Sequence, residues 1–220
     1  MHNARTKKNR RHFIASAMAC SVMPFAFYSH AQSQAKAHIL VLGDSLSAEY
    51  GLARGQGWVH LLEQRLAQEK IDAQVTNASV SGDTTSGGRS RLPALLQKHR
   101  PTVVIIELGG NDALRGLPLQ GTRDNLGAMI RFAQQAGAQV LLLGMQMPPN
   151  YGKKYAQDFA QMYGQVAQTH QAQLLPFFLK DVADAANPTA LFQADRIHPT
   201  AQAQPIMLEN VWPLLRPMLK

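Results

Sequence analysis

Cysteine is almost absent from this sequence of 220 residues, where Cys20 is the single example. Cys20 lies in an apolar N-terminal stretch that we expect to be removed, and no cysteine follows Gln32. Without a thiol, the remaining chain forms neither a disulfide nor a cysteine nucleophile. Covalent catalysis, if present, must use another nucleophile.

Signatures of metal and nucleotide binding are missing as well. No two histidines after Gln32 have the spacing of helical metal ligands, and no cysteine completes a zinc set, so we expect no metal site. We also expect that no cofactor is required. These histidines are His38, His60, His99, His170 and His198. Neither Gly-x-Gly-x-x-Gly after the first predicted strand nor a Gly-Lys-Ser/Thr P-loop occurs, which disfavours a nucleotide-binding α/β protein.

Acidic residues are absent from the first 31 positions, which hold five of the 22 basic residues. The excess of eight positive charges therefore falls to three beyond this segment, and we expect no nucleic-acid partner. A basic start, an apolar stretch over 13–27 interrupted by Pro24, and small residues at Ser29 and Ala31 predict a signal peptide over residues 1–31.

Residues 32–220 are then expected to form one monomeric domain with no integral membrane span, located in the periplasm or secreted. Arg10-Arg11 resembles a twin-arginine export signal, but the general secretory route is favoured.

Hydrophobic patterning predicts strands alternating with helices over this domain. Expected strands are 39–42, 73–77, 103–108, 139–144 and 173–176. Expected helices are 58–66, 90–98 with Pro93 in its first turn, 122–135, 153–170 and one after Pro199. The alternation implies an α/β fold with a parallel sheet covered by helices on both sides.

Ser45 follows the first predicted strand and is the candidate nucleophile, which requires a base, an orienting acid and oxyanion donors. Asp195 and His198 are three residues apart, so the carboxylate can accept from Nδ1–H while Nε2 faces Ser45. Taken singly, Ser45 fits a helix cap and His198 a surface histidine.

Gly82 and Asn111 follow the second and third predicted strands, and parallel strands end at one edge of a sheet, where ligands bind. A turn glycine and an Asx cap are the structural alternatives for these two residues. Convergence of three loops on one edge favours a site. The chain has no Gly-x-Ser-x-Gly elbow, so an ordinary α/β-hydrolase is not indicated.

Four segments resemble the conserved blocks of the SGNH (GDSL) hydrolases. They are Gly-Asp-Ser-Leu-Ser at 43–47, the glycine after Ala-Ser-Val-Ser at 82, Gly-Gly-Asn-Asp at 109–112, and Asp-x-x-His at 195–198. The resemblance is strongest to bacterial periplasmic arylesterases, acyl-CoA thioesterases and lysophospholipases, and it covers nearly the whole domain. It implies a three-layer α/β/α, flavodoxin-like fold with a five-stranded parallel sheet.

The same resemblance implies that Ser45 is the nucleophile, His198 the base and Asp195 its orienting acid. It makes the Ser45 N–H, the Gly82 N–H and the Asn111 amide the oxyanion donors. Arg196 is a departure, because related sequences often have a small residue there; it restricts the cleft or pairs with an anionic substrate.

The implied activity is hydrolysis of small-molecule carboxylic esters or thioesters through an acyl-serine. A carbohydrate O-acetyl esterase of the same family and a secreted binding module with little catalysis are the alternatives. Leu114 and Leu117, after the Asn111 block, and Met147 and Pro148, after the fourth strand, are expected beside the cleft. Ordinary loop packing explains these four residues equally well.

Overall fold

The computed structural model describes residues 1–2, 36–147 and 149–219, and everything below concerns the domain within 36–219. Most of the predicted signal peptide, and Pro148 in the predicted cleft, lie outside the described residues. No helix within these ranges is long and apolar enough to cross a membrane.

The domain is built on one five-stranded sheet in which every neighbouring pair is parallel. Its strands are β1 (Ala37–Gly43), β2 (Ala73–Asn77), β3 (Val103–Glu107), β4 (Gln139–Leu143) and β5 (Gln173–Leu175). Their order is β2-β1-β3-β4-β5, so the chain moves first to one side of β1 and then to the other. The predicted α/β class with a five-stranded parallel sheet is confirmed.

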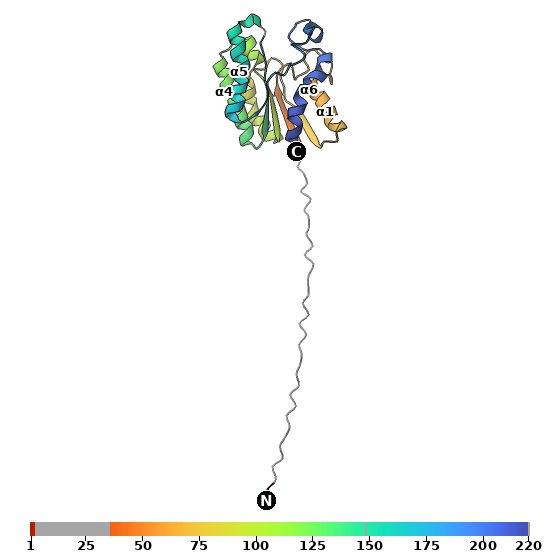
Figure 1. The fold of residues 1–220 in the computed structure, drawn as a ribbon, viewed down its shortest axis with the longest axis vertical. Helices are drawn as coiled ribbons and strands as arrows, with labels where there is room; N and C mark the ends of the chain where they lie inside the picture. Colours follow the sequence, from red (N-terminus) through yellow and green to blue (C-terminus); the bar gives the residue numbers. More distant parts are fainter. Residues whose placement is uncertain (3–35, 148, 220) are drawn as a thin grey trace. The chain divides into compact units, whose positions relative to one another are not determined.

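Helices cover both faces of this sheet (Figure 1). The helix α1 (Trp58–Gln68) packs with α6 (Gln204–Leu215) on one face. The helices α2 (Thr85–His99), α4 (Leu119–Gln135) and α5 (Lys153–His170) pack together on the other. The central strand β3 is buried along its whole length, and its first four residues are apolar because helices cover both faces of the sheet.

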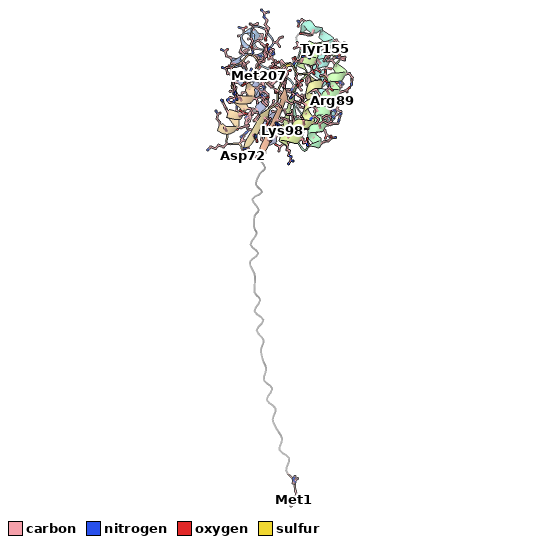
Figure 2. All side chains as sticks on the ribbon, turned by 180° about the vertical axis from the view of Figure 1, so that it is seen from behind. Met1, Asp72, Arg89, Lys98, Tyr155 and Met207 are labelled. Carbon is pink, nitrogen blue, oxygen red and sulfur yellow. The ribbon has the colours of Figure 1, made fainter. Side chains whose placement is uncertain are left out.

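All five strands run toward the same edge of the sheet. Asp72, just before β2, and Lys98, near the end of α2, lie toward the lower end in Figure 2. Tyr155, in the first turn of α5, lies at the upper end. The upper end is therefore where the strands finish and where the loops carrying Ser45, Gly82 and Asn111 emerge.

The helix α2 begins at Thr85, five residues before the predicted start, so Pro93 lies in its interior rather than in its first turn. Two contacts explain the earlier start. The Thr84 hydroxyl caps the helix by accepting from the Gly87 N–H, and the Asp112 carboxylate accepts from the Thr85 N–H at 2.8 Å. Asp112 is 27 residues away from Thr85 in the sequence, so local patterning does not reveal this contact.

The junction after β4 is crowded by backbone. The Gly144 N–H donates to the Leu175 carbonyl at 2.7 Å, and the Gly144 carbonyl accepts from the Phe178 N–H at 2.8 Å. A Cβ at Gly144 would lie 2.4 Å from the Pro176 oxygen and 3.0 Å from the Leu175 oxygen. These are main-chain atoms, so the neighbouring strand would have to shift.

We therefore expect Gly144→Ala to destabilise the domain by about 2 kcal/mol, the usual scale of overpacking. Gly164→Ala is the matched control, because this glycine lies within α5 and a Cβ there meets nothing within 4 Å. Alanine should stabilise that helix by roughly 1 kcal/mol. Urea unfolding of both variants measures the two changes, and equal effects would contradict the crowding at Gly144.

Candidate active site

Ser45, His198 and Asp195 form a continuous hydrogen-bonded chain. The Ser45 Oγ lies 2.8 Å from His198 Nε2, and His198 Nδ1 lies 2.7 Å from Asp195 Oδ2. Ser45 comes from the loop after β1, and the other two residues come from the loop before α6, 153 residues away. This geometry allows the imidazole to take the serine proton while the carboxylate holds its other nitrogen.

Asp195 is fixed as an acceptor by its own loop. Its Oδ1 accepts from the Ile197 N–H at 2.9 Å and from the His198 N–H at 3.0 Å. These backbone hydrogen bonds, and the bond to the His198 ring, lower the pKa of Asp195 to about 2. The carboxylate is therefore ionised at neutral pH and oriented toward the imidazole.

A short antiparallel turn presents His198 to the serine. Phe192 and Pro199 bridge its two arms, and the Gln193 N–H donates to the His198 carbonyl at 2.8 Å. Gln193 Nε2 also donates to the Tyr50 carbonyl at 2.9 Å, which joins this turn to the serine loop. The Tyr50 ring lies over the His198 ring with centroids 4.3 Å apart, so it covers the face of the imidazole.

The N–H groups of Ser45 and Gly82 are the predicted oxyanion donors, and neither donates a hydrogen bond within the part of the chain that the structure describes. Gly82 has φ of +77°, a left-handed conformation that glycine adopts without steric cost, and Arg115 Nη2 donates to its carbonyl at 2.8 Å. The loop is held by the ion pair of Arg91 with Asp83, 2.6 Å between Nη2 and Oδ2.

Asn111 lies in α3 (Gly110–Leu114), directly after β3. Its Nδ2 donates to Asp44 Oδ2 at 2.9 Å, which leaves the second amide hydrogen for another acceptor. Asp44 Oδ1 accepts from the Leu46 N–H at 3.0 Å. Burial raises the pKa of Asp44 to about 6, although its hydrogen bonds oppose that shift.

A buried polar cluster lies beneath the serine loop. Glu107 Oε2 accepts from the Asp44 N–H at 3.2 Å and from Ser47 Oγ at 2.8 Å. The Trp58 indole N–H donates to the same serine oxygen at 3.1 Å. Burial, and the nearby charge of Asp44, raise the pKa of Glu107 well above its ordinary value. The end of β3 is thus tied to the loop that carries Ser45.

An apolar cleft of about 480 Å³ opens beside the serine. Most of its wall is apolar, and the apolar side chains come mainly from the segments that follow β3, β4 and β5. They include Leu114, Met145, Met147, Phe177, Leu179 and Phe192. The structure therefore brings the predicted residues Leu114 and Met147 to the cleft, whereas Leu117 lies outside its lining. Leu117 is 39% exposed at the surface.

Four residues of the site had no predicted role, namely Asp44, Ser47, Tyr50 and Glu107. One signal was visible: Glu107 is a carboxylate in an otherwise apolar strand, and a buried charge requires partners. Asp44 and Ser47 lie within two residues of the candidate serine in the sequence. Their partners belong to other segments of the chain, and periodicity carries no information about them.

Comparison with known proteins identifies relatives over most of the domain. The model of the GDSL-like Lipase/Acylhydrolase family matches residues 41–205. Esterase TesA of Pseudomonas aeruginosa is 52% identical over 188 residues, covering 86% of this chain and 92% of the relative. The arylesterase of Vibrio mimicus is 44% identical, covering 84% and 91%.

Thioesterase 1/protease 1/lysophospholipase L1 of Escherichia coli K12 is 39% identical, with 82% of this chain and 84% of the relative covered. The crystal structure of TesA superposes with a TM-score of 0.79 over 82% of this chain and 99% of that structure. Agreement in sequence and in backbone over nearly the whole domain shows that this chain belongs to the GDSL-like lipase/acylhydrolase family, the SGNH hydrolases.

Proposed function

We propose that this protein is an exported serine esterase that hydrolyses small carboxylic esters and thioesters through an acyl-serine intermediate. The observation that carries the proposal is the unbroken hydrogen-bonded chain from Ser45 through His198 to Asp195. Relatives named esterase, arylesterase and thioesterase/lysophospholipase support the reaction class.

In the first step His198 Nε2 takes the Ser45 proton as Oγ attacks the carbonyl carbon of the substrate. The resulting oxyanion accepts from the Ser45 N–H, the Gly82 N–H and the free hydrogen of the Asn111 amide. The imidazolium, stabilised by Asp195, then protonates the leaving alcohol or thiol. Water, deprotonated by the same imidazole, releases the acid and regenerates the serine.

The wall of the cleft indicates which part of the substrate it receives. Methionine, leucine and phenylalanine side chains dominate the lining and exclude water from an apolar group. Met145 and Met147 add adaptable surface, because a thioether chain fits groups of several shapes. We assign this cleft to the acyl chain. No metal or cofactor takes part in the proposed steps.

The test of this function is the variant Ser45→Ala, which removes the nucleophilic oxygen from a half-buried position. We expect kcat/KM for p-nitrophenyl butyrate to fall at least about 1000-fold with little change in thermal stability. A fluorophosphonate should label the wild-type protein at Ser45 and leave the variant unlabelled. Near-normal hydrolysis by the folded variant would contradict the mechanism. A folded wild-type protein without hydrolysis or labelling would favour a binding module.

The proposed export rests on the basic start and the apolar stretch over 13–27. We expect the protein in native cells to begin near Gln32 and to be recovered outside the cytoplasm. Cell fractionation followed by N-terminal sequencing measures both properties. A cytoplasmic protein that retains Met1 would refute export and leave the esterase assignment untouched.

A further inference from the structure

Arg196 adopts a backbone conformation that disfavours its side chain. Its φ is +59°, in the left-handed region where a residue with a Cβ is strained and glycine is not. The turn around it imposes this angle, because the Arg196 N–H donates to the Gln193 carbonyl at 2.9 Å just before the chain returns to His198. A strained residue beside a catalytic histidine is a candidate for function.

The position of Arg196 gives its charge a direct route to a bound substrate. It lines the cleft together with His198 and Ile197. No other lysine or arginine is present in that lining. In the part of the chain that the structure describes, its guanidinium also makes no salt bridge and no side-chain hydrogen bond. Its five donors are therefore available.

Two acids, Asp195 next to Arg196 in the chain and Asp44 in the cleft lining, already have partners. Asp195 binds the His198 ring and two backbone N–H groups, and Asp44 binds the Asn111 amide and the Leu46 N–H. Neither acid therefore neutralises the guanidinium by a direct contact. The cleft presents an unpaired, permanent positive charge next to a mainly apolar wall.

We propose that Arg196 is a specificity residue that favours substrates carrying an anionic oxygen group, a carboxylate, sulfonate or phosphate, over neutral substrates of the same shape. The inference rests on the proposed esterase function and deepens it. Guanidinium forms charge-assisted, often paired hydrogen bonds with such groups. The anion belongs either to the acyl chain or to the leaving group, and the experiment separates these two sources.

Two matched pairs of esters provide the measurement. For the acyl chain, the p-nitrophenyl monoester of adipic acid is compared with that of adipic monoamide. For the leaving group, the butyrate of 4-hydroxybenzenesulfonate is compared with the butyrate of 4-hydroxybenzenesulfonamide. The quantity of interest is the ratio of kcat/KM for the charged ester to kcat/KM for its neutral partner, determined at low salt.

The central variant is Arg196→Gly, which removes the charge and relieves the left-handed strain, so it should fold at least as well as the wild type. Arg196→Lys keeps the charge. Arg89→Ala is the matched control, because it removes one positive charge from α2 at a residue that does not line the cleft.

We expect Arg196→Gly to lower the ratio about 5-fold for at least one pair, the scale of a partly solvated ion pair. Arg196→Lys should retain most of the preference, Arg89→Ala all of it, and added salt should weaken it in the wild type. The pair that responds identifies where the anion lies.

An unchanged ratio for both pairs in Arg196→Gly would overturn the proposal. So would an equal loss in Arg89→Ala, because the preference would then come from overall charge rather than from Arg196. Failure of the esterase function itself is recognised separately: the wild-type protein would then hydrolyse none of the four esters, including the neutral ones.

Discussion

The hydrogen bond from the Asn111 amide to Asp44 is the contact on which the geometry of the site depends. It joins the loop after β1, which carries Ser45, to the short helix after β3, and Asn111 Nδ2 lies 2.9 Å from Asp44 Oδ2. Asp44 fixes the direction of the amide, and its own N–H is held by Glu107 at the end of β3. Two neighbouring strands of a parallel sheet thus determine where Ser45 and the Asn111 amide lie.

This arrangement has an electrostatic cost. Burial raises the pKa values of Asp44 and Glu107, because a charged carboxylate is poorly solvated in the domain interior. The hydrogen bonds from Leu46, Asn111 and Ser47 offset part of that cost. Asp195 shows the opposite case: it has backbone donors and remains partly exposed, and its pKa is lowered to about 2. The same site therefore contains two carboxyl groups with a raised pKa, Asp44 and Glu107, and one with a lowered pKa, Asp195.

Much of this fold follows from local patterning. The strand over 73–77 and the helix over 153–170 have the predicted bounds. Their bounds were predictable because the pattern of apolar and polar residues that defines them lies within each segment. The start of α2 does not, since it depends on Asp112, which belongs to α3 and is 27 residues away from Thr85. The residues of the candidate site were recognisable by motif, and parallel strands that end at one edge explain why they meet.

The partners of those residues were not predictable in the same way. Asp44 lies next to Ser45 in the sequence, yet its role depends on an amide 67 residues away. Glu107 is detectable as an acid within an apolar strand, but only the folded structure shows that it accepts from the Ser47 hydroxyl, which itself accepts from the Trp58 indole. The prediction for Leu117 was wrong. It was expected beside the cleft because it follows Asn111 closely in the sequence, but its side chain does not line the cleft.

The role proposed for Asn111 is to stabilise negative charge that exists only in the transition state. Steady-state kinetics of Asn111→Ala and Asn111→Asp test this role. Loss of one oxyanion donor should lower kcat about 100-fold while KM stays nearly constant. At pH 8, Asn111→Asp should be at least as damaging, because a carboxylate repels both the oxyanion and Asp44. A folded Asn111→Asp enzyme with wild-type kcat would contradict the account.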